Sequence, residues 1–428
     1  MVKKIKLAYG KTEFSLALEP ERLLAVLLPG ELPSPQDEAA LVRKAMANPV
    51  GTPRLQEIVR DGETACIIVG DMTRLWVRHH VLLPLILDEL NRGGIADENI
   101  TLVSATGAHR EQTKEEHLQL IGAEAYRRVR VVDHKCRDED LVDYGPTTYG
   151  TPVRINRHVA NADRVILTGG IVYHFLAGYG GGKKALMPGV ADYAGIMANH
   201  RLALNPDGPG LNRDVCAGKM TGNPLSDDML QAVEKVGIDF IVNTIINDEH
   251  QIALAVAGDV VEAHEAGCSL VDKYFGVPIK EQADLVIASC GGYPKDINFY
   301  QTYKTTHNMV PALKKGGVGI LLSESCEGVG NDLFYTICTD HSDNVAREDA
   351  LRSDFEIASF MGYTQLLWAQ QNRFIAVTGM PHQQVRNMGM TPATSLEEAL
   401  SIAKSLLSED YTAYIMPEGS TTFPILQP

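Results

Sequence analysis

The sequence feature that most constrains the fold is an alternation of apolar runs of strand length with amphipathic stretches of helix length. This alternation is typical of α/β proteins, in which helices cover a largely parallel sheet. Buried strands are expected at four early runs: Thr64–Gly70, Ile100–Ser104, Val129–Val132 and Arg164–Leu167. Helices are expected at three amphipathic stretches: Leu82–Asn91, Glu111–Ile121 and Asp227–Val236.

A second series of apolar runs predicts a second sheet, with strands at Asp284–Ala288, Gly319–Ser323 and Phe374–Thr378. A helix is expected between the two series, at Val260–Phe275. We therefore predict two α/β domains, residues 1–270 and 271–407, with a cofactor and substrate cleft between them. Segment Lys3–Glu19 is expected to form a hairpin. Residues 408–428, with a strand at Tyr411–Pro417, are expected to return to the first domain.

Composition and charge exclude several classes of protein. The net charge of −15 argues against a nucleic-acid or anionic-membrane partner, because both need clustered lysine and arginine. Seven scattered cysteines without a C-x-x-C pair indicate reduced thiols. No run of 18 apolar residues appears, and no apolar segment follows the basic start, so a membrane helix and a signal peptide are not expected. We expect a cytoplasmic protein without a nucleic-acid or membrane partner, and the sequence does not indicate its oligomeric state.

Residues suited to chemistry follow several expected strands. Asp71, His109 and His174 each come shortly after a strand of the first series, and Lys295-Asp296 follows a strand of the second. Open α/β sheets bind ligands beyond the carboxyl ends of their strands. The four endings therefore predict one shared site.

The segment richest in such residues contains the glycine run Gly178-Tyr179-Gly180-Gly181-Gly182, followed by two lysines. Glycines let backbone amides approach a ligand closely, as in loops that bind phosphate. The run departs from the P-loop motif, because Ala177 replaces its first glycine and Lys184 replaces its serine or threonine. ATP hydrolysis is therefore disfavoured.

Together these motifs resemble the lactate racemase family. The resemblance runs in order from about residue 70 to 304. It rests on the following residues: Asp71-Met72-Thr73-Arg74, Thr106-Gly107-Ala108-His109-Arg110, His174, Gly178 to Lys184, Pro188-Gly189, His200, and Tyr300-Gln301-Thr302-Tyr303-Lys304.

The resemblance implies a racemase or epimerase of a 2-hydroxy acid, lactate by default. It also implies a nickel ion in a pyridinium-3,5-bisthiocarboxylic acid mononucleotide, the nickel-pincer nucleotide, linked to Lys184, with Lys183 as the competing position. His200 would be the single protein ligand of nickel, and His109 and His174 would be the acid/base pair. The implied cofactor-binding residues are Asp71, Thr73, Arg74, Gly181, Gly182 and Pro188. The implied substrate-binding residues are Tyr300, Gln301 and Lys304.

The implied chemistry is removal of hydride to give a 2-oxo acid, which can be reduced again on either face. After Arg74 the chain reads Leu75-Trp76-Val77-Arg78, where the family often has Pro-Thr-Pro. This departure leaves the substrate open, and malate or a sugar acid are alternatives to lactate. An alternative of another class is a nickel- or cofactor-binding protein without turnover.

Overall fold

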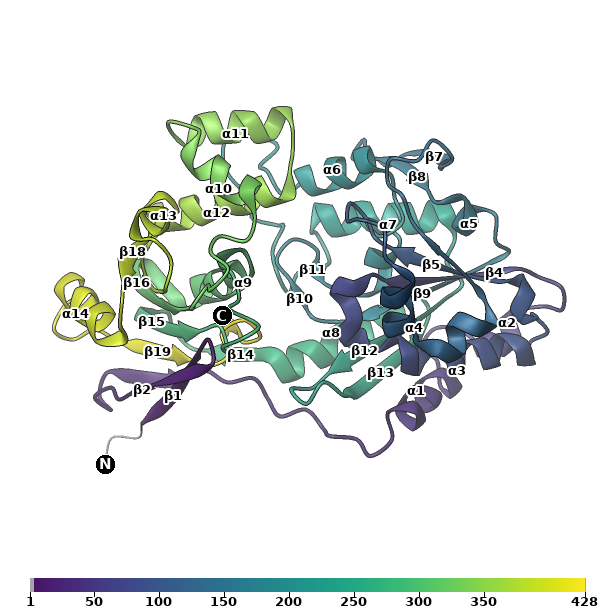
Figure 1. The fold of residues 1–428 in the computed structure, drawn as a ribbon, viewed down its shortest axis with the longest axis horizontal. Coiled ribbons are helices and arrows are strands. Elements are labelled where there is room, and N and C mark those ends of the chain that lie inside the picture. Colours follow the sequence, from purple (N-terminus) through teal and green to yellow (C-terminus); the bar gives the residue numbers. More distant parts are fainter. Residues whose placement is uncertain (1–3, 428) are drawn as a thin grey trace. The chain divides into compact units, whose positions relative to one another are not determined.

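The structure is a computed structural model that describes residues 4–427 and divides into two compact units (Figure 1). Residues 31–206 and 212–272 form one unit, which we call the N-terminal unit. The other described residues form the C-terminal unit. Each unit contains a six-stranded sheet with helices, so the prediction of two α/β domains is confirmed. The predicted cleft stays a prediction.

The N-terminal unit is built on a sheet with strand order β13-β12-β9-β4-β5-β6. Neighbouring strands are parallel except for the antiparallel pair β12 and β13. The strands are β4 (Ala65–Gly70), β5 (Ile100–Ala105), β6 (Arg130–Asp133), β9 (Arg164–Gly170), β12 (Phe240–Ile246) and β13 (Ile252–Gly258). All four strands expected in the first series are present.

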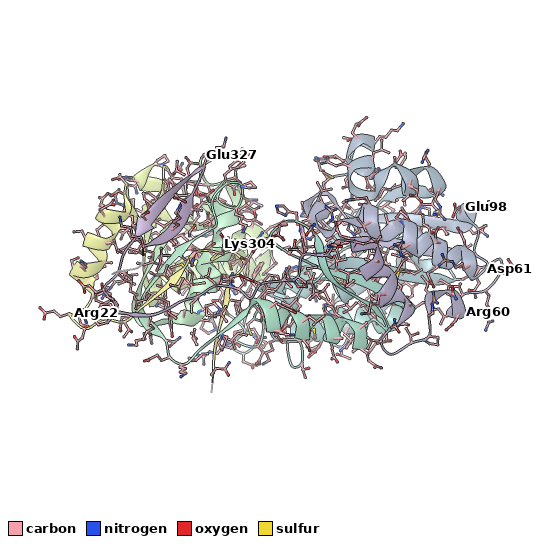
Figure 2. The ribbon with its side chains drawn as sticks, turned by 90° about the horizontal axis from the view of Figure 1, so that it is seen from below. Arg22, Arg60, Asp61, Glu98, Lys304 and Glu327 are labelled. Carbon is pink, nitrogen blue, oxygen red and sulfur yellow. The ribbon has the colours of Figure 1, made fainter. Side chains whose placement is uncertain are left out.

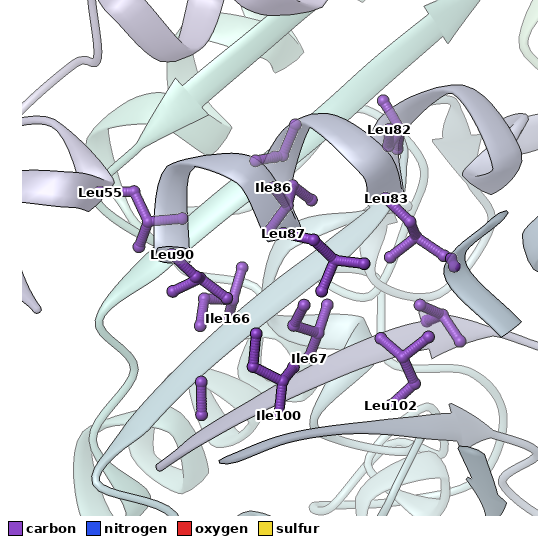
Figure 3. Close-up of a cluster of buried hydrophobic side chains, with 14 of the residues drawn as sticks. Leu55, Ile67, Leu82, Leu83, Ile86, Leu87, Leu90, Ile100, Leu102 and Ile166 are labelled. Carbon is purple, nitrogen blue, oxygen red and sulfur yellow. The ribbon is translucent and has the colours of Figure 1, made fainter. Parts of the chain in front are cut away.

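Helix α3 (His79–Arg92) packs apolar side chains on β4, β5 and β9 in one buried cluster (Figure 3), to which α1 (Glu38–Ala47) and α4 (Lys114–Arg128) also contribute. In α3, the fully buried Leu83, Leu87 and Leu90 recur at helical spacing. The helices are α1 (Glu38–Ala47), α2 (Leu55–Ile58), α3, α4 (Lys114–Arg128), α5 (Arg157–Ala160), α6 (Tyr193–Arg201), α7 (Pro224–Val236) and α8 (Glu262–Phe275), with short 3-10 turns η1 (Met72–Val77), η2 (Asp97–Asn99) and η3 (Gly182–Ala185). The helices expected from the sequence are confirmed with small shifts of their ends, except that α4 continues past the predicted end at Ile121, across a kink at Gly122, to Arg128.

Replacing Leu87 with alanine is expected to lower the free energy of unfolding by about 2–5 kcal/mol. Leu87 is fully buried in the cluster, so truncation leaves a cavity among packed side chains. The matched control is Leu85→Ala on the same helix, which should cost less because Leu85 is only partly buried. Chemical denaturation followed by circular dichroism measures both. Equal losses for the two variants would contradict this account of the core.

The C-terminal unit is built on a parallel sheet with strand order β18-β17-β16-β15-β19-β3. The strands are β3 (Leu23–Val26), β15 (Ala283–Ser289), β16 (Leu313–Leu322), β17 (Arg373–Val377), β18 (Thr391–Ala393) and β19 (Ala413–Met416). The helices are α9 (Phe299–Met309), α10 (Asp332–Thr339), α11 (Asn344–Ser353), α12 (Ile357–Gln371), α13 (His382–Asn387) and α14 (Leu396–Leu406), with the 3-10 turn η4 (Val310–Ala312). All three strands of the second series are confirmed.

The prediction that residues 408–428 return to the first domain is wrong. The strand itself is present as β19, but it pairs with β15 on one side and β3 on the other. All four of its residues are buried, which fits a central position in this sheet. The segment 417–427 continues in the same unit through β20 (Phe423–Leu426), which pairs with β14 (Gly276–Ile279).

The assignment of the first 30 residues to the N-terminal domain is also wrong for the described part. The expected hairpin is present as β1 (Ile5–Tyr9) and β2 (Thr12–Leu16), and Lys3 lies outside the described residues. Leu7 and Leu16 are buried in a cluster with Ile287 of β15, which places the hairpin in the C-terminal unit.

Residues 207–211 likewise belong to the C-terminal unit, although they lie within the predicted first domain. The backbone N–H of Gly210 donates to Glu348, and Arg352 donates to the carbonyl of Gly208. Among residues 4–427, no helix is long and apolar enough to cross a membrane.

Candidate active site

Three strand ends of the N-terminal unit meet at one edge of its sheet. β9, β4 and β5 are parallel neighbours, and Gly70 at the end of β4 is paired with Ala105 at the end of β5. Asp71, His109 and the loop that begins at Ile171 therefore leave the sheet on the same side. This arrangement is compatible with the predicted shared site. Lys295-Asp296 follow β15 in the sheet of the other unit, as the sequence predicts, and the grouping of all four endings in one site stays a prediction.

Asp71 and His109 form a hydrogen-bonded pair. His109 Nδ1 lies 2.5 Å from Asp71 Oδ2, while Asp71 Oδ1 accepts from the backbone N–H and the hydroxyl of Thr73. Burial raises the pKa of Asp71, but the hydrogen bonds from His109 and Thr73 outweigh it and leave the pKa below its ordinary value. The carboxylate is therefore ionised, and both of its oxygens are engaged by side chains from the ends of two strands.

His174 lies in a two-stranded turn formed by β10 (Tyr173–His174) and β11 (Gly178–Tyr179). Its Nδ1 accepts the backbone N–H groups of Leu176 at 3.2 Å and of Ala177 at 3.1 Å. The ring also stacks on Phe175. The three residues between the two short strands therefore fix the orientation of the imidazole.

The glycine run closely approaches the middle of β12. Gly182 N–H donates to Asn243 Oδ1 at 2.7 Å. A Cβ at Gly181, where φ is +72°, would lie 2.6 Å from Asn243 Oδ1, and one at Gly182 would lie 2.7 Å from the His264 ring. His264 in turn hydrogen-bonds to the Gly180 carbonyl. Only glycine fits at these two positions, so a compact cradle of backbone is held against Asn243 and His264.

Asn243 is a residue of this region that the sequence motifs do not reveal. It is fully buried, and its Nδ2 has no hydrogen-bond partner within the described part of the chain. A buried donor in that state points to a missing acceptor. The only signal in the sequence is a polar residue inside the apolar run Phe240–Ile246.

Lys184 and His200 occupy buried settings after the glycine run. Burial, with the positive charges of Arg74 and Lys183, lowers the pKa of Lys184 to about 7. His200, on α6, is 4% exposed, and burial followed by the charge of Lys184 lowers its pKa to about 4. His200 Nδ1 lies 2.8 Å from the Ile196 carbonyl, which can only accept, so the proton is on Nδ1 and Nε2 keeps a lone pair.

Two further buried histidines, His134 and His264, support the site loops. The carbonyl of His134 accepts from Thr106, and its Nε2 hydrogen-bonds to the Ala191 carbonyl. Burial lowers the pKa of both histidines to about 4. Both are therefore neutral in the folded protein near pH 7.

The free energy of unfolding is expected to fall as pH is lowered from about 6.5 to about 5. An unfolded histidine has a pKa of about 6.5, so in this window the unfolded chain binds protons that buried His134 and His264 do not. The slope is at most about 1.4 kcal/mol per pH unit for each histidine. Denaturation at several pH values measures it, and His134→Gln should reduce it. A slope unchanged by that variant would refute the assignment.

Gln301 and Lys304 lie one helical turn apart on α9 of the C-terminal unit, where Lys304 is exposed (Figure 2). Lys304 Nζ donates to Gln301 Oε1 at 3.1 Å. Tyr300 packs its ring against the edge of Phe334. The predicted substrate residues thus share one helix, and Gln301 and Lys304 form a neighbouring amide and ammonium.

Comparisons with known proteins cover nearly the whole chain. The family model "Lactate racemase N-terminal domain" matches residues 9–210, and "Lactate racemase C-terminal domain" matches residues 279–423. The lactate racemase of Thermoanaerobacterium thermosaccharolyticum is 33% identical over 97% of this chain and 97% of its own length. The chain belongs to the lactate racemase family. It is accordingly an isomerase, as the resemblance predicts.

Other members of the lactate racemase family support the same assignment. The lactate racemase of Lactiplantibacillus plantarum is 30% identical over 89% of this chain and 90% of its own length. The solved structure of the lactate racemase apoprotein from T. thermosaccharolyticum has a TM-score of 0.89, with 31% identity over 99% of this chain and 100% of that one. The two-unit fold is therefore that of the family.

Proposed function

We propose that the protein interconverts the two enantiomers of lactate with the help of a nickel-pincer nucleotide attached to Lys184. The observation that carries this proposal is a buried histidine, His200, whose Nε2 keeps its lone pair and whose pKa is lowered by burial and by the charge of nearby Lys184. Imidazole nitrogen is a good ligand for nickel, and a backbone acceptor at the other ring nitrogen is the usual support of a metal-binding histidine. The names of the relatives support lactate as the substrate.

The residues present fit such a cofactor. No group of three or more histidine, cysteine, aspartate or glutamate side chains in residues 4–427 is arranged to hold a metal. A metal bound by His200 would therefore need its other ligands from the cofactor. The glycines at 181 and 182 let the backbone pack closely against Asn243 and His264, and the unpaired Nδ2 of Asn243 would serve as a donor to the nucleotide.

Further cofactor contacts are assigned to Thr73, Arg74 and Pro188. Arg74 reaches back to Thr73 and raises the local positive potential near Lys184, which suits a phosphate group. Pro188 belongs to the turn after Lys184, in which Gly189 N–H donates to the Lys184 carbonyl. A contact of Asp71 with the cofactor stays a prediction, since its oxygens already accept from Thr73 and His109.

When bound, the nickel-pincer nucleotide would supply a reversible acceptor for the hydride on C2 of the substrate. A flat 2-oxo acid could then form and be reduced on either face. The chain supplies the proton chemistry and the orientation. His109 and His174 would take up the proton of the substrate hydroxyl and return it. Histidine is suited to this because its ordinary pKa is near neutral pH. Gln301 and Lys304, with Tyr300, would hold the substrate carboxylate through an amide and an ammonium group.

The test is an enantiomer-resolved assay of protein made in a host that loads a known relative with cofactor. L-lactate, L-malate and a sugar acid are supplied in parallel, with unloaded protein as the control. We expect conversion of L-lactate to a racemic mixture and slower or no conversion of the others. Preferential turnover of malate or the sugar acid would replace the substrate. Nickel-loaded protein that converts none of them would favour a non-catalytic cofactor-binding protein.

A further inference from the structure

The two histidines of the acid/base pair have opposite hydrogen-bond environments at Nδ1. We infer that His109 and His174 are held in opposite tautomers: His109 presents an unprotonated Nε2, and His174 presents an Nε2–H. We further infer that Asp71 is the positioning residue that sets the state of His109. The role of these tautomers in catalysis rests on the proposed function, whereas the tautomers themselves follow from the hydrogen bonds alone.

The state of His109 follows from the carboxylate beside it. Asp71 Oδ1 is occupied by the N–H and the hydroxyl of Thr73, and the lowered pKa keeps the group ionised. An ionised carboxylate can only accept hydrogen bonds. His109 Nδ1, 2.5 Å from Oδ2, must therefore carry a proton. In the neutral ring the lone pair is then on Nε2, where it can take up a proton.

The state of His174 follows from its own loop. Backbone N–H groups can only donate, and those of Leu176 and Ala177 both point at His174 Nδ1. Nδ1 must therefore be the unprotonated nitrogen, and the neutral ring carries its proton on Nε2. A second proton at Nδ1 would break both hydrogen bonds, so this geometry disfavours the imidazolium form.

The two histidines would therefore act differently on a substrate: His109 can accept a proton at Nε2, whereas His174 can donate one. A hydroxyl facing His109 can pass its proton to Nε2, and the O–H bonding pair becomes part of the carbonyl as hydride leaves C2 for the acceptor. The imidazolium that results lies against the negative charge of Asp71. At His174 the oxygen instead receives a hydrogen bond from Nε2–H. For Nε2 of His174 to accept a proton, the ring must first change tautomer: Nδ1 must leave both amides and gain a proton, and Nε2 must release its own.

The tautomers can be measured without cofactor or substrate. Histidine labelled with ¹⁵N in the unloaded protein gives distinct nitrogen signals for protonated and unprotonated ring nitrogens at about pH 8, where an ordinary histidine is neutral. The chain has 13 histidines, and single His→Gln variants assign His109 and His174. Internal references exist in the same unit: His200 should carry its proton on Nδ1, and His134 and His264 should carry theirs on Nε2.

We expect His109 to match His200, and His174 to match His134 and His264. In Asp71→Asn, Thr73 continues to donate to Oδ1 and so turns the new amide NH₂ group toward His109. We therefore expect the His109 proton to move from Nδ1 to Nε2 in this variant, while the reference signals stay unchanged. Nε2–H on wild-type His109, Nδ1–H on His174, or a His109 tautomer unaffected by Asp71→Asn would overturn the inference.

Two activity measurements on loaded protein complete the test. Asp71→Asn should lower racemisation about 10²–10⁴-fold, as loss of a correctly oriented base does, with nickel content unchanged. His174→Gln, which keeps an N–H donor at the position of Nε2, should be more active than His174→Phe. Loss of nickel in Asp71→Asn, or equal activities of the two His174 variants, would contradict the assigned roles. If the tautomers are as expected but the loaded protein racemises no substrate, the proposed function would be overturned and the tautomer inference would stand.

Discussion

Lys184→Ala protein, made in a cofactor-loading host, is expected to lack both the added mass of the cofactor and any detectable racemisation. The side chain is the proposed point of covalent attachment. Its buried setting lowers its pKa to about 7, so an appreciable fraction of the amine is uncharged and able to form a bond near neutral pH. Intact-mass spectrometry reports the attachment, and metal analysis of the same sample reports nickel.

The matched control for this variant is Lys183→Ala, one residue away. Burial also lowers the pKa of Lys183, but the carboxylates of Asp227 and Glu265 act in the opposite direction. We expect Lys183→Ala to keep the added mass and nickel. Loss of the added mass in Lys183→Ala, with retention in Lys184→Ala, would move the attachment to Lys183.

His200→Ala is expected to remove nickel while the organic part of the cofactor stays attached to Lys184. The variant deletes the single protein ligand assigned to the metal, whereas the glycine cradle and Lys184 are unchanged. Racemisation should fall below detection, because the proposed hydride acceptor is the nickel-loaded cofactor and amino-acid side chains do not replace it. The measurements are nickel per chain and intact mass.

His134→Gln serves as the control for His200→Ala. His134 is also buried and neutral, with a pKa lowered to about 4, but it hydrogen-bonds to the Ala191 carbonyl through Nε2. We expect this variant to keep nickel at the wild-type ratio and to lose only stability. Full nickel content in His200→Ala would show that the metal is held elsewhere.

Much of the fold can be predicted from the sequence because most strands are local apolar runs. β4 and β15 are examples, each buried along nearly its whole length. The sheet that a run joins is a long-range property, which is why the position of β19 is mispredicted. α12 is not apparent from the sequence, because it is buried on most of its surface and has no polar stripe to mark a helical period.

The candidate site can be predicted in part, because its motif residues follow parallel neighbouring strands. Asp71 and His109 come together as expected from β4 and β5. The direction of each hydrogen bond is not encoded in any local pattern. The opposite settings of His109 and His174 depend on Thr73 and on the amides of Leu176 and Ala177, which only the folded loops bring into place.

The central claim, that the chain racemises lactate by hydride removal, is tested most directly with L-lactate carrying deuterium at C2. Loaded protein is incubated with this substrate in ordinary water, and the deuterium content of the D-lactate formed is measured at low conversion. The account predicts that D-lactate keeps the deuterium, because hydride leaves C2 and returns to it without entering solvent. D-lactate that has exchanged its deuterium for solvent hydrogen would show proton removal at C2 and contradict the account.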